Sequence, residues 1–241
     1  MTEPQVMLVT GAGRGIGAAI ARCAAAQGFT VVLNYSASAA SAIELAADLG
    51  NGAFAVRANL GIESEIEAMF ETIDRTVGRL DSLINNAGIS GSYGTLDTVT
   101  ADMLTQLLAI NVTGAFICAR EAVRRMPATG GTIVNISSKA AVLGGAHEWV
   151  HYAASKGAIE SMTTGLAREL APRNIRVNAV RPGLVDNNFG TAPDDRLERL
   201  RPMIPMQRVG GLDEVAEAVV WLAAHAPHYL TGSFLDVAGG R

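Results

Sequence analysis

The sequence has few of the residues that mark metal sites and disulfide-bonded scaffolds. It contains 2 cysteines and 4 histidines among 241 residues, and none of them forms a C-x-x-C, an H-E-x-x-H or another metal-ligand pattern. Cys23 and Cys118 lie in alanine-rich stretches of helical character, so both are expected to be buried free thiols. We therefore expect no metal site.

Long blocks of one charge and long apolar runs are also missing. The net charge is −4, and no polybasic segment suited to nucleic acid or to an anionic membrane surface is present. The first apolar run, residues 6–10, is shorter than a signal-peptide core or a membrane span. We therefore expect a cytoplasmic protein without a nucleic-acid or membrane partner.

Short β-branched segments instead alternate with longer helical patterns almost from end to end. This alternation is typical of βαβ units with a parallel sheet. In residues 62–77 apolar side chains recur at helical spacing, as in a helix that covers a sheet. The candidate strands are residues 6–10, 30–35, 53–58, 81–86, 131–137, 174–180 and 233–238. The pattern predicts an α/β fold: a doubly wound parallel sheet of about seven strands with helices on both faces.

No internal repeat, low-complexity tract or linker divides the chain, so residues 1–241 are expected to form a single domain. Residues 186–211 differ in composition from the rest of the chain, because they combine several prolines and a Gly-Gly pair with the charged run DDRLERLR. We interpret this segment as a substrate lid within the domain.

A glycine-rich segment follows the first candidate strand and opens an alanine-rich helix. Gly11, Gly15 and Gly17 have the spacing G-x-x-x-G-x-G. Glycine permits a tight turn and a close approach of the backbone to a pyrophosphate, which then lies at the positive N-terminus of the helix. The order of strand, loop and helix predicts a dinucleotide site in a Rossmann-type fold, and a purely structural tight turn is the alternative.

The residues after the second candidate strand bear on which dinucleotide is bound. An NAD site usually has an acidic residue about 20 residues beyond the glycines, which holds the ribose 2′-hydroxyl. Asn34, Tyr35 and Ser36 stand in that region, without a carboxylate. Arg14, inside the glycine loop, can pair with a 2′-phosphate. The sequence predicts a preference for NADP(H), with NAD(H) as the alternative.

Tyr152 and Lys156 stand four residues apart in a run of small residues, which places them on one helical face. A phenol with a pKa of about 10 is a weak acid–base catalyst near neutrality. At an effective dielectric of about 20, unit charges roughly 5 Å apart interact by about 3 kcal/mol, and one pKa unit is about 1.4 kcal/mol. Lys156 is therefore expected to lower the pKa of Tyr152. A half-exposed helix with an ordinary tyrosine and lysine is the bland alternative.

Seven segments in one order give the sequence a family resemblance. They are Thr10–Gly17, Asn85–Gly88, Asn111 in INVTGAF, Ser138 after IVNIS, Tyr152-x-x-x-Lys156, Pro182–Gly183 and the C-terminal LTGSFLDVAGG. Together they span residues 10–240 and resemble the classical short-chain dehydrogenases/reductases. Members with similar C-termini include 3-oxoacyl-carrier-protein reductases and sugar dehydrogenases, and the sequence does not choose between these substrates.

The resemblance implies a role for each of four catalytic residues. Tyr152 would protonate the carbonyl oxygen during reduction, or take the alcohol proton in reverse. Ser138 would orient the substrate oxygen. Lys156 would bind the nicotinamide ribose and lower the tyrosine pKa, and Asn111 would hold a water in a proton relay.

The resemblance also implies which residues contact the cofactor. Asn86–Gly88 would line the ribose side, and Pro182–Gly183 with the backbone after them would cover the nicotinamide. The full set is Gly11, Arg14, Gly15, Ile16, Gly17, Asn34, Tyr35, Ser36, Asn59, Leu60, Asn86, Ala87, Gly88, Tyr152, Lys156, Pro182, Gly183 and Val185. Two positions depart from the family: Asn59 replaces an aspartate on the adenine edge, and Asn187 replaces a threonine that helps to hold the carboxamide.

Three assignments near the tyrosine keep alternatives open. Ser137 and Ser138 are adjacent, and a strand turns neighbouring side chains to opposite faces, so only one can face the site. Ser138 resembles the family's second serine, and Ser137 is the alternative. His151 is expected at an interface or on the surface, whereas Trp149 and Tyr93 are candidates for the substrate mouth.

The sequence therefore predicts an NADP(H)-dependent oxidoreductase that interconverts a carbonyl and a secondary alcohol of a small molecule. A dinucleotide-binding redox sensor or scaffold without turnover is the alternative. The resemblance also implies a homotetramer, with helices near 101–126 and 153–171 and the last strand between subunits.

Overall fold

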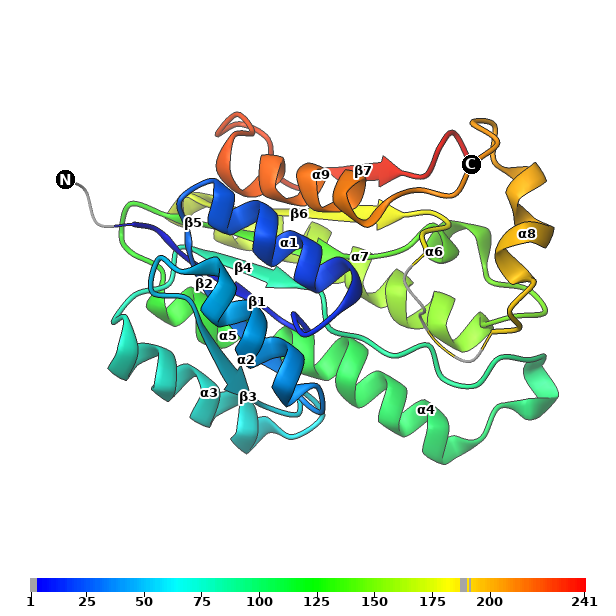
Figure 1. Cartoon of the computed structure of the whole chain (residues 1–241), viewed down its shortest axis with the longest axis horizontal. Helices are drawn as coiled ribbons and strands as arrows, with labels where there is room; N and C mark the ends of the chain where they lie inside the picture. Colours follow the sequence, from blue (N-terminus) through cyan, green and yellow to red (C-terminus); the bar gives the residue numbers. More distant parts are fainter. Residues whose placement is uncertain (1–3, 187–189, 191) are drawn as a thin grey trace.

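One parallel sheet forms the centre of the structure, a computed structural model that describes residues 4–186, 190 and 192–241. Its seven strands have the order β3-β2-β1-β4-β5-β6-β7, and every neighbouring pair is parallel (Figure 1). The strands are β1 (Val6–Val9), β2 (Thr30–Tyr35), β3 (Phe54–Arg57), β4 (Ser82–Asn85), β5 (Gly131–Ile136), β6 (Ile175–Pro182) and β7 (Phe234–Val237). The predicted α/β fold is confirmed.

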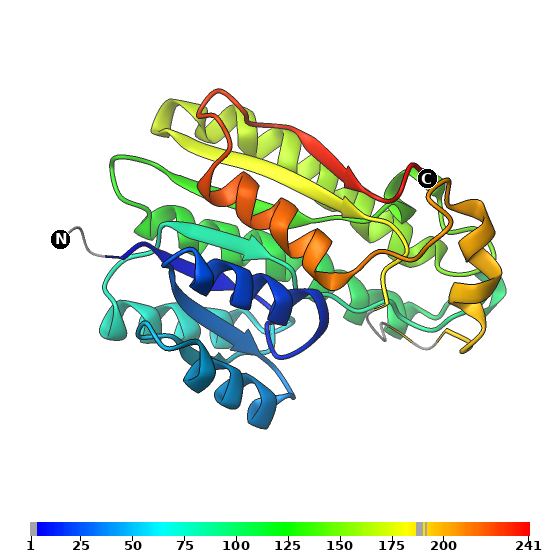
Figure 2. The same ribbon diagram turned by 45° about the horizontal axis from the view of Figure 1, so that its top comes forward.

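Helices cover both faces of the sheet. Residues of α1, α2 and α9 share one apolar core, and residues of α3, α5 and α7 share the other (Figures 1 and 2). The α-helices are α1 (Gly15–Ala26), α2 (Ala39–Leu49), α3 (Glu63–Thr76), α4 (Ala101–Leu108), α5 (Gly114–Arg125), α6 (Ala140–Leu143), α7 (Val150–Leu170), α8 (Arg196–Leu200) and α9 (Leu212–Ala224).

β1 shows why the central strands are apolar throughout. Its side chains alternate between the two cores: Met7 and Val9 pack on one side, and Val6 and Leu8 on the other. Because helices cover both faces, no position of this strand points to water, which explains a continuous apolar run in place of an alternating one.

The strand order creates a crevice between β1 and β4. The chain leaves β1 toward β2 and β3 on one side and returns to β4, β5, β6 and β7 on the other. The connections diverge at this point, so the carboxyl ends of β1 and β4 are left uncovered. Ligands of doubly wound sheets bind at such switch points.

The stretch Ala101–Arg125 runs through α4, a π-helical turn (η2, Ala109–Thr113) and α5. Among the described residues it is the one helix long and apolar enough to cross a membrane, and 28% of its most apolar window is buried. Length and composition alone set this criterion, and core helices of globular proteins also meet it.

The predicted lid, residues 186–211, contains α8 and a turn of 3₁₀ helix (η4, Arg201–Met203). Leu200 and Ile204 of this segment form a small core of their own with Leu184. A parallel bridge between Val185 and Gly210 closes its base. Residues 187–189 and 191 lie outside the described residues.

The two cysteines differ in burial. Cys118 is buried, as predicted. Cys23 is only half-buried, because it lies beside the core that α1 forms with the sheet and not within it. The prediction of two buried thiols is therefore wrong for Cys23.

We expect Gly17 to tolerate no larger residue, because α1 packs closely on the loop before it. An added Cβ would lie 2.6 Å from Asn86 Nδ2 and against the Gly11 carbonyl oxygen. Gly17→Ala should therefore lower the free energy of unfolding by about 1–3 kcal/mol in urea denaturation. Gly210→Ala is the control, since its nearest contact would be an ordinary 3.5 Å, and should change stability by less than about 0.5 kcal/mol. Equal effects of the two substitutions would contradict the close packing.

Candidate active site

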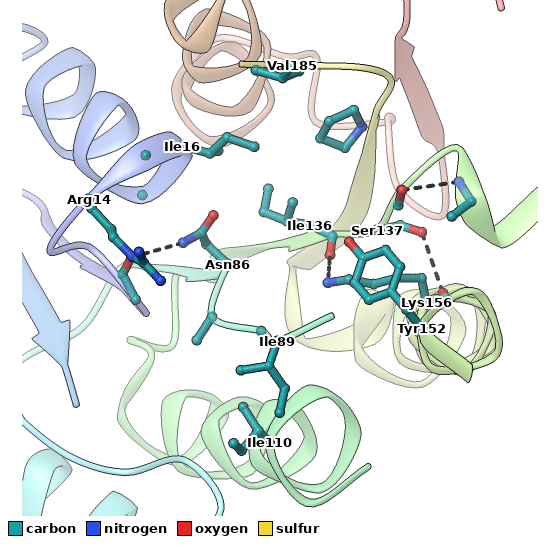
Figure 3. Close-up of a pocket in the computed structure, with 18 of the residues that line it drawn as sticks. Arg14, Ile16, Asn86, Ile89, Ile110, Ile136, Ser137, Tyr152, Lys156 and Val185 are labelled. Carbon is teal, nitrogen blue, oxygen red and sulfur yellow. Dashed lines mark hydrogen bonds between the residues drawn. The ribbon is translucent and has the colours of Figure 1, made fainter. Parts of the chain in front are cut away.

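A cavity of about 470 Å³ lies at the carboxyl ends of the strands, at the switch point (Figure 3). Its lining includes the glycine loop and residues 34–38, 58–60, 86–89, 136–140 and 182–185. The structure thus gathers all the residues predicted to contact the cofactor around one space. Of the predicted catalytic residues, Ser138, Tyr152 and Lys156 line it, and Asn111 lies behind the wall.

The glycine loop leaves the N-terminus of α1 open toward this cavity. Gly11 and Gly15 have φ values of 64° and 55°, in the left-handed region that favours glycine. The first turn of α1 contains no acidic residue. Its partial positive charge is therefore available to an anionic group, and the loop fits a pyrophosphate.

The side-chain amides of Asn34 and Asn86 hold the loop in this shape. The Gly11 N–H donates to Asn34 Oδ1 (3.2 Å), and Asn34 Nδ2 donates to the Ala58 carbonyl (3.1 Å). Asn86 Nδ2 donates to the Thr10 carbonyl at 2.8 Å. Asn34 and Asn86 line the cavity, but these contacts shape the loop itself.

Thr10 is a residue whose part the sequence argument missed. Its hydroxyl accepts hydrogen bonds from the N–H groups of Asn86 (2.9 Å) and Ala87 (3.0 Å), which joins β1 to the segment after β4. The signal in the sequence was a hydroxyl residue at the end of an apolar strand, directly before the first glycine.

Among the described lining residues, no carboxylate lies at residues 34–38, where β2 ends. Arg14 and Ser36 are exposed, and Tyr35 is half-buried. Asn59 also lines the cavity, but its Oδ1 accepts from the Gly61 N–H at 3.0 Å. Its assignment to the adenine edge stays a prediction.

Tyr152 and Lys156 project from α7 on one face and meet the end of β5. Lys156 is buried, and its Nζ donates to the Ile136 carbonyl at 2.7 Å (Figure 3). The same Nζ lies 5.6 Å from the centre of the Tyr152 ring. One helical turn thus places an ammonium beside a phenol at the wall of the cavity.

The predicted downward shift of the Tyr152 pKa is wrong. Burial among protein atoms raises the pKa of Tyr152 to about 12, and the hydrogen bond with Ser138 and the charge of Arg196 oppose this only in part. Burial also lowers the pKa of Lys156 to about 8. The desolvation that both groups share outweighs the charge effect that the spacing suggested.

Both serines follow the last residue of β5 and line the cavity, but their hydroxyls have different partners. Ser138 is hydrogen-bonded to Tyr152 and lies in the cavity wall. Ser137 is buried and donates to Glu160 Oε1 at 2.8 Å. The geometry favours Ser138 over Ser137 as the partner of the tyrosine hydroxyl.

Asn111 lies in the π-helical turn η2, a type of helix distortion that is frequent at functional sites. Its Nδ2 donates to the Ile89 carbonyl (2.8 Å) and to Ser155 Oγ (3.0 Å), and its Oδ1 accepts from the Ile89 N–H (2.8 Å). The side chain therefore clamps the segment after β4 to α7. Its role in holding a water stays a prediction.

The opposite wall follows the end of β6. A Cβ on Gly183 would lie 2.8 Å from Ala238 Cα, so a side chain has no room there. Pro182 and Val185 are buried and line the cavity. Asn187, the second departure from the family pattern, lies outside the described residues.

Residues before α7 and in α8 form the remaining end of the cavity. Trp149 lines it, as predicted, but Tyr93 does not and instead meets the Trp149 ring edge-on at 5.4 Å. Glu148 and Arg196 also line it and were not predicted, because their proximity depends on the path of the lid.

The surface position predicted for His151 is wrong, because the loop after β4 packs on the first turn of α7. His151 is buried, and its Nε2 lies 2.9 Å from the Ser90 carbonyl. It faces this loop and not the cavity.

No group of three or more His, Cys, Asp or Glu side chains suited to a metal ion occurs in the described part of the chain. The described lining thus combines a glycine loop with a Ser–Tyr–Lys wall and contains no metal cluster.

Comparison with known proteins agrees with this geometry. A family model described as "Enoyl-(Acyl carrier protein) reductase" matches residues 11–241. An uncharacterized oxidoreductase of Escherichia coli, YgfF, is 45% identical over 98% of this chain and 99% of its own length. The chain belongs to the short-chain dehydrogenase/reductase family.

Two further family members resemble the chain over nearly its whole length. The 3-oxoacyl-[acyl-carrier-protein] reductase FabG of Aquifex aeolicus is 36% identical over 99% of this chain and 97% of its own. A short chain dehydrogenase from Burkholderia cenocepacia, crystallised in complex with NADP, is 35% identical with a TM-score of 0.93, covering 98% of this chain and 97% of its own.

Burial of Lys156 predicts a pH-dependent stability. Its pKa falls from 10.5 to about 8 on folding. Between these values the folded protein binds fewer protons here than the unfolded chain, so stability rises with pH. From about pH 7.5 to about pH 9.5 this site should add about 2 kcal/mol to the free energy of unfolding.

Urea denaturation at both pH values, compared with Lys156→Met, measures this contribution. The variant loses the lysine but keeps other buried groups, such as the thiol of Cys118, whose pKa burial raises to about 12. Parallel pH profiles of the two proteins would refute the assignment.

Proposed function

We propose that this protein is an NADP(H)-dependent oxidoreductase that interconverts a carbonyl and a secondary alcohol, with Tyr152 as the acid–base residue. One observation carries the proposal: the Ser138–Tyr152–Lys156 wall and the glycine loop face the same cavity. The NADP complex of the similar Burkholderia cenocepacia enzyme supports the choice of cofactor.

The residues present fit such a cofactor. The open N-terminus of α1 suits the pyrophosphate, and Arg14, with no carboxylate among the neighbouring residues 34–38, suits a ribose 2′-phosphate. Lys156, Asn86–Gly88 and Pro182–Gly183 would enclose the nicotinamide riboside. When bound, NADPH supplies the hydride for reduction.

The chain's own residues supply the proton and the orientation. The Ser138 hydroxyl, already hydrogen-bonded to Tyr152, would bind the substrate oxygen beside the phenol. A tyrosine is protonated at neutral pH, and burial raises the pKa of Tyr152 further, so the phenol carries the proton that it would donate to an oxygen that becomes an alkoxide, a much stronger base. The charge of Lys156, fixed by the Ile136 carbonyl, stabilises the tyrosinate that remains.

The expectations on assembly and location become proposals of the same kind. We propose a cytoplasmic homotetramer of single-domain subunits, each with residues 186–211 as a substrate lid. Two apolar side chains on the helical stretch Ala101–Arg125 support the tetramer: Leu108 is 43% exposed and Phe116 is 44% exposed.

Removal of the Tyr152 hydroxyl should abolish turnover and leave cofactor binding intact. We expect Tyr152→Phe to lower kcat for NADPH-dependent reduction by at least about 100-fold, the range of general acid catalysis, in a panel of aldehydes, ketones and quinones. NADPH affinity, followed by its fluorescence, should change by less than about threefold. Tyr229→Phe is the control, since Tyr229 is fully exposed.

If the unaltered protein binds NADPH but oxidises it with no carbonyl, a sensor or scaffold replaces the enzyme. If Tyr152→Phe keeps its activity, another group supplies the proton.

Arg14 should set the choice between NADPH and NADH. Loss of a guanidinium–phosphate contact lowers affinity by about 10–100-fold, so Arg14→Ala should lower kcat/KM for NADPH by that factor and leave the value for NADH unchanged. Arg22→Ala, an exposed position on the same helix, is the control. Equal losses with both cofactors would contradict a 2′-phosphate contact.

A further inference from the structure

Arg196, the first residue of α8, is held at the cavity by two neighbours from the segment before α7. Its Nε and Nη2 donate to Glu148 Oε2 at 3.2 Å and 2.7 Å. Its guanidinium carbon lies 4.7 Å from the centre of the Trp149 ring. The side chain is only 17% exposed. A cation–π contact and two hydrogen bonds thus fix the plane of the guanidinium.

One edge of this guanidinium remains available. A guanidinium has five N–H donors, and Glu148 accepts from only two of the three nitrogens. Nη1 has no hydrogen-bond partner among the described residues and is not enclosed. Arg196, Trp149 and Tyr152 line the same cavity. The guanidinium that carries the unbonded Nη1 therefore belongs to the same wall as the tyrosine.

The charge of Arg196 is not cancelled by its partner. Glu148 also accepts from Arg199 Nη2 at 3.4 Å, so one carboxylate faces two guanidinium groups. Tyr152 also senses the positive charge of Arg196, which acts to lower its pKa against the effect of burial.

The described lining of the cavity as a whole also has more positive than negative side chains. Among its described lining residues, Glu148 is the only acidic side chain, against the cations Arg14, Lys139, Lys156, Arg196 and Arg241. Arg14 and Lys156 are accounted for by the proposed cofactor, and Lys139 is paired with Asp236 at 2.8 Å. Arg196 is the cation beside Tyr152 that neither the cofactor nor a full ion pair explains.

We propose that Arg196 binds a carboxylate of the substrate, so that the preferred substrates are carbonyl compounds that also carry a carboxylate. The inference rests on the proposed function, because it places the reacting carbonyl at Tyr152. The carboxylate would accept from Nη1 in a charge-assisted hydrogen bond, while Glu148 and Trp149 keep the guanidinium oriented.

Trp149 provides a test that does not depend on turnover. The chain has 2 tryptophans, so Trp221→Phe leaves Trp149 as the single indole, in contact with Arg196. The probes are pyruvate, acetoacetate and levulinate, each paired with its methyl ester, titrated into the NADP⁺-saturated variant while tryptophan fluorescence is followed. The three acids place the carboxylate at increasing distance from the ketone.

We expect at least one acid to bind about tenfold or more tightly than its ester, the range of a hydrogen bond to a charged group. Arg196→Gln in the same background should abolish that difference by weakening the acid alone. Arg196→Lys should keep part of it. Arg199→Gln is the matched control, since Arg199 shares Glu148 but does not line the cavity, and it should keep the full difference.

Equal binding of every acid and its ester would overturn the proposal. So would an equal loss for both members of a pair in Arg196→Gln, which would reveal a structural role, or the same effect in Arg199→Gln. Failure of the proposed function gives a different result: selective binding of an acid with no NADPH oxidation in the unaltered protein.

Discussion

The hydrogen bond from Lys156 to the Ile136 carbonyl is the contact on which the rest of the site depends. It joins the second turn of α7 to the last residue of β5. Because helix geometry is fixed, this contact also determines where Tyr152 lies, one turn earlier, opposite Ser138. A buried ammonium needs hydrogen-bond acceptors, and the Ile136 carbonyl supplies one. The lowered pKa of Lys156 shows that burial still destabilises its charged form. Such a cost is typical of functional sites.

A second set of charges supports the same corner from behind. Glu160, one turn beyond Lys156, accepts from Ser137 Oγ and from Arg181 Nε at 2.6 Å. Arg181 belongs to β6, so this network ties three elements together directly beside Ser138. The serine whose hydroxyl is bound to Glu160 thus helps to hold the backbone of the serine that is bound to Tyr152.

The fold could be predicted from the sequence because strands and helices each leave their own spacing of apolar residues. Buried parallel strands and amphipathic helices leave distinct patterns, and the seven candidate strands differ from the observed ones only at their ends. The lining of the cavity on this side was also predictable, since the glycines and Asn86–Gly88 lie directly after strands whose carboxyl ends meet at one edge. Each of these inferences used residues close together in the chain.

What could not be predicted depends on contacts between distant segments. The Tyr152 pKa was misjudged because spacing reveals the nearby lysine and does not reveal desolvation by the whole wall. His151 is buried because a loop 61 residues away packs on it. Arg196 meets Glu148 and Trp149 only because α8 packs beside the segment before α7, an arrangement that no local pattern encodes.

The order of the strands has a consequence for how such a protein can diverge. The segments proposed to face the adenosine half of the nucleotide lie at the ends of β1, β2 and β3, whereas the proposed reacting wall follows β5 and begins α7. The two meet only across the switch point. If these proposals hold, mutations in one group of segments can alter coenzyme choice while the chemistry is unchanged, and the segment that contains Arg196 can vary independently of both.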